Sequence, residues 1–207
     1  MTLIPSTELG EALIGILNNA ELINENSVID YKVEPYSKDK DCELFKDVLA
    51  MANSCDRPGE DRWIIFGVEN RTRRPIGVDA ADPNLLDDSA FQQKLQKIEP
   101  HLVIELVEVP AEKVLDTNAE NKKFVAFYIP SSNVGEVYEL SSPVKNKVPN
   151  SRGELTRYEA GTSFIRIGSS TNPLREKDRI RIRSLKESLR TLFTHRLHPP
   201  PNHFALR

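Results

Sequence analysis

The sequence contains little cysteine and has no uninterrupted apolar segment long enough to cross a bilayer. Its two cysteines, Cys42 and Cys55, fall in one predicted helix, where their spacing corresponds to roughly 20 Å of helical rise. That separation excludes a disulfide between them. Neither has a second Cys or a His at metal-ligand spacing, so we expect two reduced thiols that face the core. Together with the lack of an N-terminal apolar run like a signal peptide, this indicates a reducing, cytoplasmic location.

Several functional motifs are absent as well. The sequence has no glycine-rich phosphate loop, no Ser-His-Asp order and no zinc motif. It also has no internal repeat and no low-complexity tract. ATP binding by this chain therefore has no support in the sequence.

A positive net charge is also lacking, because the formal net charge is −3. This value argues against a simple basic nucleic-acid binder. The charges are unevenly distributed, however: acidic residues outnumber basic ones in residues 1–56, and basic residues outnumber acidic ones in residues 141–197. This asymmetry indicates a surface for a polar partner that is built largely from the C-terminal third.

The length of 207 residues fits one domain over residues 1–195, followed by a Pro-rich tail or linker over residues 196–207. Apolar periodicity predicts helices at 6–20, 41–55, 83–98 and 174–196, and strands at 27–34, 63–68, 75–78, 102–109, 123–129, 155–159 and 163–167. We expect three antiparallel pairs: 63–68 with 75–78, 102–109 with 123–129, and 155–159 with 163–167. Residues 131–153 and 168–173 are predicted to be loops. The order of elements predicts an α+β fold with helices packed on a mixed, largely antiparallel sheet.

Three carboxylates, Glu25, Asp30 and Glu69, border the first two predicted strands. Clustered carboxylates bind Mg²⁺ or Mn²⁺, which neutralises a scissile phosphate and activates a nucleophile, so these residues are the candidate catalytic and metal-binding set. Side chains alternate along a strand, and an ideal strand would place residues 25 and 30 on opposite faces. Glu25 must therefore precede the regular strand, or a bulge must intervene. The alternative interpretation is solvated charges at strand ends.

Lys32 shares the strand face of Asp30. It is a candidate catalytic residue that stabilises charge on the phosphate. The alternative for Lys32 is a salt bridge to Asp30 or Glu69.

The candidate nucleic-acid contacts are basic or hydroxyl residues in turns, loops and the last strand. They are Arg71, Arg73, Arg74, Lys145, Lys147, Arg152, Arg166, Ser169 and Ser170. A strand arginine such as Arg166 can grip a phosphate in a bidentate manner while neighbouring hydroxyls add hydrogen bonds. Each of these residues has an ordinary alternative, either a solvated charge or a structural arginine.

Five motifs in order resemble the Schlafen AlbA_2 domain family. They are Glu25 followed by Asp30-Tyr31-Lys32, then Met51-Ala52-Asn53-Ser54, Phe66-Gly67-Val68-Glu69, Pro75-Ile76-Gly77-Val78, and Phe164-Ile165-Arg166-Ile167-Gly168-Ser169-Ser170-Thr171. The similarity spans roughly residues 20–190. Asp30 replaces the usual Glu and Glu69 the usual Asp, and the charged turn through Gly59 replaces a usual Gly-Gly.

The resemblance implies nucleic-acid binding. In animal Schlafens the domain is also an endoribonuclease that cleaves structured RNA such as tRNA with three carboxylates at these positions, and some microbial relatives belong to phage-defence loci. We therefore expect a nucleic-acid-binding domain that prefers RNA to DNA and carries a Mg²⁺- or Mn²⁺-dependent endoribonuclease site. The alternatives are a non-catalytic DNA- or RNA-binding sensor or regulator, and an assembly module that forms a homodimer. No membrane partner is expected.

Overall fold

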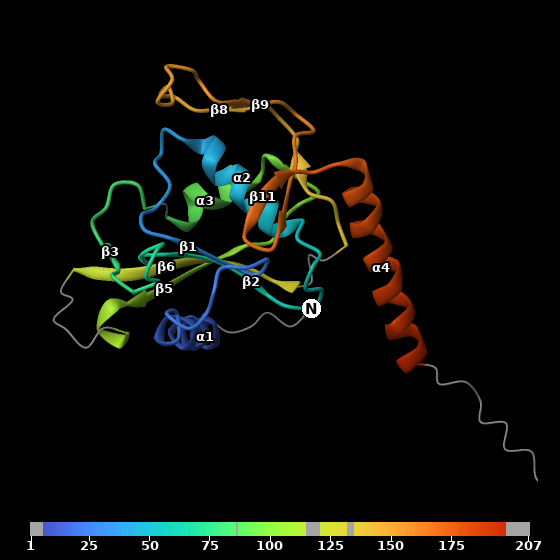
Figure 1. Ribbon diagram of the computed structural model, residues 1–207, viewed down its shortest axis with the longest axis horizontal. Helices are drawn as coiled ribbons and strands as arrows, with labels where there is room; N and C mark the ends of the chain where they lie inside the picture. The colour runs from blue at the N-terminus through green and yellow to red at the C-terminus, as the bar shows by residue number, and fades with distance from the viewer. Residues whose placement is uncertain (1–5, 86, 115–120, 132–134, 198–207) are drawn as a thin grey trace, which may run out of the picture.

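The computed structural model describes residues 6–85, 87–114, 121–131 and 135–197, apart from the side chains of residues 6, 186 and 189–197 (Figure 1). The described elements are α1 (Ser6–Asn18), β1 (Ile29–Lys32), α2 (Asp41–Ala52), β2 (Arg62–Phe66), β3 (Val78–Asp79), α3 (Asp88–Leu95), β4 (Ile98–Glu99), β5 (Glu105–Pro110), a 3-10 helix (Ala111–Lys113), β6 (Lys122–Ile129), β7 (Glu139–Leu140), β8 (Val144–Lys145), β9 (Arg157–Tyr158), β10 (Phe164–Ile167), β11 (Ser170–Pro173) and α4 (Glu176–Leu197). The predicted α+β fold class is confirmed.

A mixed, largely antiparallel sheet of five strands forms the centre of the fold, as predicted. β1 runs parallel to β2, and the other strand pairs of this sheet are antiparallel. Lys123 of β6 pairs with both Val78 of β3 and Pro110 of β5, so β3 and β5 lie on opposite edges of β6. The predicted pairing of β5 with β6 is confirmed.

Helices cover both faces of this sheet (Figure 1). The alternation of β2 explains why: Trp63 and Ile65 pack with α1, whereas Ile64 and Phe66 pack with α2 and α3. The nearly continuous apolar sequence of β2 therefore serves two cores, one on each side. Burial of both faces is the main stabilising term for this sheet, because it removes apolar surface from water.

The predicted hairpin between residues 63–68 and 75–78 is wrong. The two segments share a single antiparallel bridge, between Val68 and Pro75. The carbonyl of Gly67 accepts hydrogen bonds from the backbone N–H groups of Ile76 and Gly77, and the chain then leaves β2 to pair with β6. Both glycines have positive φ, at 90° and 67°. A Cβ atom on Gly67 would lie 2.9 Å from the backbone of Gly77, so this crossing requires glycine.

Two further pairings near the C-terminus differ from prediction. β9 pairs with β8, which lies in the predicted loop 131–153, and β10 pairs with β11 rather than with β9. Residues 168–173 are therefore not a loop: a tight turn at Gly168, with φ of 56°, returns the chain as β11. Strands of two to four residues carry too little periodic signal for their partners to be read from sequence.

The last helix, α4, starts on the body of the protein and then extends away from it (Figure 1). Ile182 and Leu185 pack against Cys55 and Ile165, and this contact holds the first half of the helix. The helix ends at Leu197, so most of the predicted tail, 196–207, lies outside the described residues.

The expectation for the cysteines is met in part. Both cysteines are free and buried, although Cys55 follows the end of α2 instead of lying within it. Among the described helices, none has both the length and the apolar character that crossing a membrane requires.

Candidate functional site

The polar face of β1 forms a buried ionic cluster. Asp30 is 3 % exposed, and its two carboxylate oxygens meet two cations: Oδ2 lies 3.0 Å from Nζ of Lys32, and Oδ1 lies 3.1 Å from Nη2 of Arg166. The predicted alternation of β1 is confirmed, since Ile29 and Tyr31 pack on the α1 side while Asp30 and Lys32 face the other way. The salt bridge that was the alternative for Lys32 is therefore present.

Two residues that the sequence did not single out extend this cluster. Asp47 of α2 lies 2.8 Å from Nζ of Lys32, and the hydroxyl of Tyr36 donates a hydrogen bond of 2.9 Å to the same carboxylate oxygen of Asp47. Burial alone would lower the pKa of Lys32, but the carboxylates of Asp30 and Asp47 outweigh it and raise that pKa. Lys32 therefore keeps its positive charge at neutral pH.

Glu25 lies beside this cluster, in the irregular segment before β1. Its Oε1 accepts a hydrogen bond of 2.9 Å from the backbone N–H of Tyr31, so the expectation that Glu25 precedes the regular strand is confirmed. Burial raises the pKa of Glu25 above the ordinary 4.5, the bond from Tyr31 opposes this rise, and the nearby charge of Asp30 adds to it. Asn26 shapes the segment, because its Oδ1 accepts hydrogen bonds from the backbone N–H groups of Val28 and Ile29.

Glu69 lies farther out, on the exposed turn after β2. Its carboxylate accepts a hydrogen bond from the hydroxyl of Thr72. Arg73 in the same turn donates to Oδ1 of Asn24, which brings the basic turn beside the segment that carries Glu25. Arg71 and Arg74 are exposed on this turn and Arg73 is half-buried.

The three carboxylates do not offer a metal-binding set in this arrangement. Asp30 is engaged by two cations, and Glu69 is bonded within its own turn. Within the described residues, no group of three or more His, Cys, Asp or Glu side chains is placed to hold a metal ion. The residues as placed do not fit the Mg²⁺ or Mn²⁺ site that the resemblance implies.

Arg166 is buried instead of lying on the surface, with an exposed fraction of 3 %. Besides its ion pair with Asp30, its Nε donates a hydrogen bond of 2.7 Å to the backbone carbonyl of Asn26. We expected Arg166 and Ser170 to bind the same phosphate, but the hairpin does not bring their side chains together. Ser170 pairs with Ile167, and Arg166 pairs with Thr171, so the two residues point to opposite faces of the β10–β11 hairpin. Ser169 is exposed in the turn between the strands.

The other candidate basic residues, Lys145, Lys147 and Arg152, are exposed on or between β8 and β9. Lys147 lies 3.6 Å from a carboxylate oxygen of Asp39. β8–β9 lies above α2 and the basic turn after β2 lies near the sheet, so the predicted nucleic-acid contacts fall on separate parts of the surface (Figure 1).

Asn53, in the Ala-Asn-Ser motif, joins the end of α2 to the strands that follow the long loop. Its amide nitrogen donates to the carbonyl of Tyr138 at 2.8 Å, to Oγ of Ser163 at 2.9 Å and to the carbonyl of Phe164 at 3.0 Å. Its Oδ1 accepts a hydrogen bond of 2.7 Å from the backbone N–H of Tyr138. The motif residue therefore positions β10, and with it Arg166.

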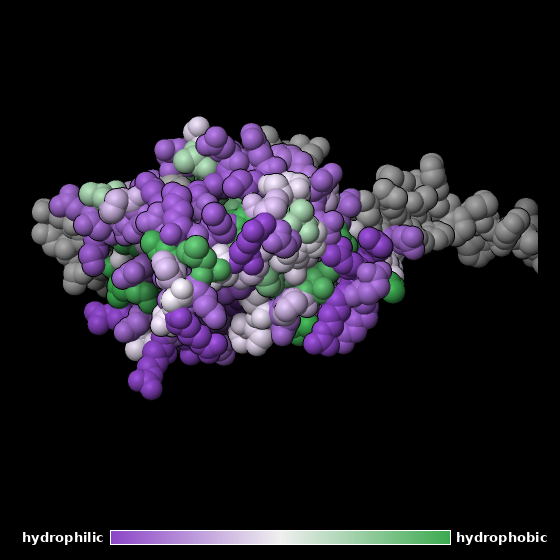
Figure 2. All heavy atoms as spheres, turned by 90° about the horizontal axis from the view of Figure 1, so that it is seen from above, coloured by the Kyte–Doolittle hydropathy of each residue, from purple (hydrophilic) through white to green (hydrophobic). Residues whose placement is uncertain are grey.

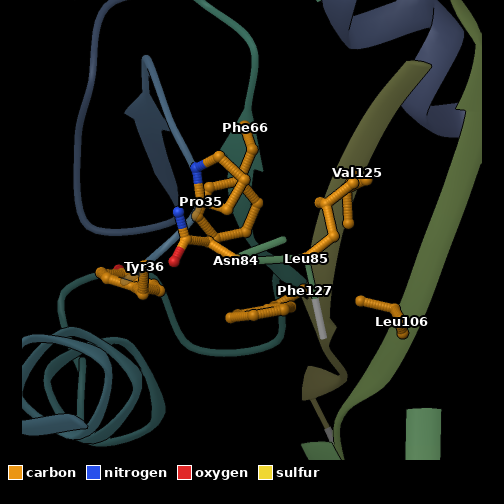
Figure 3. Close-up of a pocket in the computed structure, with 8 residues that line it drawn as sticks. All are labelled: Pro35, Tyr36, Phe66, Asn84, Leu85, Leu106, Val125 and Phe127. Carbon is orange, nitrogen blue, oxygen red and sulfur yellow. The ribbon is translucent and has the colours of Figure 1, made fainter. Parts of the chain in front are cut away.

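A narrow apolar pocket lies beside Tyr36 (Figure 3). It is lined by Pro35, Tyr36, Phe66, Asn84, Leu85, Leu106, Val125 and Phe127. Its volume of about 10 Å³ holds one water at most, so it is not a site for a nucleotide or a metabolite.

An open groove of about 420 Å³ lies between the β10–β11 hairpin and the start of α4. This volume falls within the range of roughly 300–1,000 Å³ that small-ligand sites have. On the face that Figure 2 shows, hydrophilic residues predominate and hydrophobic ones form small separate patches.

Sequence reasoning missed Asp47, Tyr36, Asn26 and the groove. A signal for Asp47 exists, because an acidic residue stands among the apolar positions Leu44, Val48 and Met51 of α2, on the side that is buried. A charge on such a face needs a partner. No comparable signal marks the groove, because β11 was not predicted.

A family model described as Schlafen, AlbA_2 matches residues 25–175. The chain belongs to the Schlafen AlbA_2 family. It is thus a domain of nucleic-acid-binding type, and the resemblance found in the sequence is confirmed.

A search among curated proteins finds no match. Among solved structures, the DIP2311 protein from Corynebacterium diphtheriae is similar, with 18% sequence identity and a TM-score of 0.41. The match covers 81% of this chain and 27% of that one, so this Schlafen AlbA_2 chain spans about a quarter of that protein's length.

Proposed function

We propose that this Schlafen AlbA_2 domain binds nucleic acid, with RNA preferred to DNA, through exposed basic residues that contact the phosphate backbone. Family membership over residues 25–175 carries the proposal. The basic residues support it: among the residues described, Arg71, Arg74, Lys145 and Arg152 take part in no salt bridge and are exposed. Free cations of this kind can exchange their counterions for phosphates.

The test is a titration of a fluorescein-labelled RNA hairpin, and of a DNA hairpin of the same sequence, followed by anisotropy at 50 and 200 mM NaCl. Binding should weaken steeply with salt, because each neutralised phosphate releases condensed counterions. Binding of neither nucleic acid at the lower salt would refute the proposal.

Removing two arginines from the turn after β2 tests which surface is used. For Arg71→Ala combined with Arg74→Ala, we expect about tenfold weaker binding at 50 mM NaCl and a slope of log K against log salt that falls by about 1.5. Lys38→Ala combined with Lys113→Ala is the matched control, since it removes the same charge from exposed positions outside the candidate set. Equal losses for the two double variants would mean that net charge, and not this turn, determines binding.

Cleavage of the bound RNA is a second candidate function, and one observation favours it: Glu25, half-buried and with a raised pKa, lies beside Lys32. Ionised Glu25 would take the proton of a ribose 2′-hydroxyl, whose oxygen attacks the phosphorus. The bond to the 5′-oxygen breaks, that oxygen takes a proton from water, and a 2′,3′-cyclic phosphate remains. Lys32 would stabilise the charge that develops on the phosphate.

For Glu25→Gln we expect at least about a hundredfold slower cleavage of a tRNA transcript, because the general base is lost. The glutamine keeps an acceptor for the N–H of Tyr31, so the fold should persist. The wild-type rate should rise with pH through the raised pKa of Glu25, since only the ionised carboxylate accepts a proton.

Glu21→Gln is the control, because Glu21 is exposed and close in sequence. The reactions are run with EDTA, with Mg²⁺ and with Mn²⁺. RNA that stays intact in all three, at high protein concentration, would rule out cleavage and leave binding untouched.

A further inference from the structure

The groove between the β10–β11 hairpin and the start of α4 combines an apolar wall with free cations. On β10, Ile165 and Ile167 point to the face opposite that of Arg166. Their cross-strand partners on β11, Asn172 and Ser170, point to the same face as the two isoleucines. All four line the groove. Arg166, on the opposite face, anchors the hairpin by its ion pair with Asp30 and its hydrogen bond to the carbonyl of Asn26. These contacts fix the position of the groove wall.

The apolar part of this wall is exposed. Ile167 is 45% exposed although it lies in a strand. Aliphatic surface of this kind, open to solvent within a concave site, contacts the flat face of a planar ligand favourably, because both surfaces leave water.

The polar part of the wall fits a base edge and a phosphate. Asn172 offers an amide that can both donate and accept, and Ser170 offers a hydroxyl. Arg175 and Lys177 are exposed, and neither takes part in a salt bridge with any residue that the structure describes. Asp178 also lines the groove, where its Oδ2 accepts a hydrogen bond of 3.0 Å from the backbone N–H of Arg175. Its negative charge disfavours a phosphate at that point and suits a base amino group instead.

We infer that this groove takes one unpaired nucleotide of the bound nucleic acid. The base lies against Ile167 with its edge toward Asn172 and Asp178, and the adjoining phosphate lies toward Arg175 and Lys177. The volume of about 420 Å³ suits a single nucleotide and not a paired one. This inference rests on the proposed nucleic-acid binding and names its substrate class: nucleic acid with unpaired bases, in single strands, loops or bulges.

The experiment uses the full chain and a ten-nucleotide single-stranded RNA with 2-aminopurine at its centre. The same strand annealed to its complement and a DNA strand of the same sequence are the other two probes. We expect the single-stranded RNA to bind about fivefold or more tightly than the duplex, since only unstacked bases can be taken up. The 2-aminopurine fluorescence should change on binding, because its stacking neighbours change. The DNA arm tells whether the ribose hydroxyl contributes.

Ile167→Ser removes the apolar wall at an exposed position. It should weaken binding of the single strand about fivefold and leave duplex binding within about twofold, as expected when one base contact is lost. Ile180→Ser is the matched control, because Ile180 is 58% exposed, is the same residue type and does not line the groove. Thermal unfolding of both variants verifies that each is folded.

Each failure has a distinct meaning. Equal affinity for single strand and duplex, or equal effects of the two serine variants, would overturn the groove as a nucleotide site while salt-dependent binding persists. If none of the probes binds at 50 mM NaCl, the proposed function itself fails.

Discussion

Replacing Arg166 by methionine is expected to lower the free energy of unfolding by about 3 kcal/mol, at the lower end of the range for breaking a buried ion pair. Arg166 and Asp30 are both almost fully buried. Removal of the arginine therefore leaves the Asp30 carboxylate in a low-dielectric environment, with Lys32 as its remaining cation partner. The backbone carbonyl of Asn26 loses its donor as well. Urea denaturation of the variant and the wild type measures the difference.

Two further variants separate charge from packing. Asp30→Asn combined with Arg166→Met should cost less than the sum of the single changes, because the uncompensated charge is gone. Arg166→Lys should also destabilise the protein. A lysine ammonium lacks the planar set of donors by which the guanidinium contacts Asp30 and the carbonyl of Asn26 at the same time. A loss below about 1 kcal/mol for Arg166→Met would show that Lys32 alone satisfies Asp30.

The same variant distinguishes the two roles considered for Arg166. If the residue only fixes the hairpin, Arg166→Met measured well below its unfolding temperature should keep the wild-type salt dependence of nucleic-acid binding. If it contacts a phosphate, the slope of log K against log salt should fall by about 0.7–0.9.

Much of the fold could be predicted because the signals that determine it are local. The apolar run of β2 and the pattern of β6 predict buried strands, and both are found within one or two residues of the expected bounds. The irregular position of Glu25 followed from the alternation of β1 alone. The pairing of strands was less predictable, because β8, β9 and β11 have two to four residues each and their partners are chosen by long-range contacts.

The candidate site was predicted in part for a similar reason. The sequence indicates that Asp30 and Lys32 share a face, and the structure brings them together. The sequence does not indicate that Arg166, far along the chain, forms an ion pair with Asp30, or that Asp47 of α2 forms one with Lys32. A cluster of carboxylates attracts cations whether these are metal ions or side chains, and residue types alone do not separate the two outcomes.

Replacing Asn53 by alanine is expected to destabilise the protein by about 2–4 kcal/mol, because several buried polar groups lose their partners at once. The backbone N–H of Tyr138 and the carbonyl of Phe164 both bond to this side chain. The carbonyl of Tyr138 keeps a second donor, the hydroxyl of Ser163, which limits the cost. Asn19→Ala is the control: its side chain makes one exposed hydrogen bond to Gly15, and its loss should cost less than about 0.5 kcal/mol.

The effect of Asn53→Ala should also be local, because the side-chain amide of Asn53 bonds to Tyr138, Ser163 and Phe164 and so joins α2 to the start of β10. Amide hydrogen exchange should therefore accelerate in β10 and β11 more than in β6. Nucleic acid with unpaired bases should then bind more weakly even where the variant is folded, because the hairpin forms one wall of the groove. Uniform acceleration across β6 and β10 would instead mean that Asn53 stabilises the whole domain and does not specifically position the hairpin.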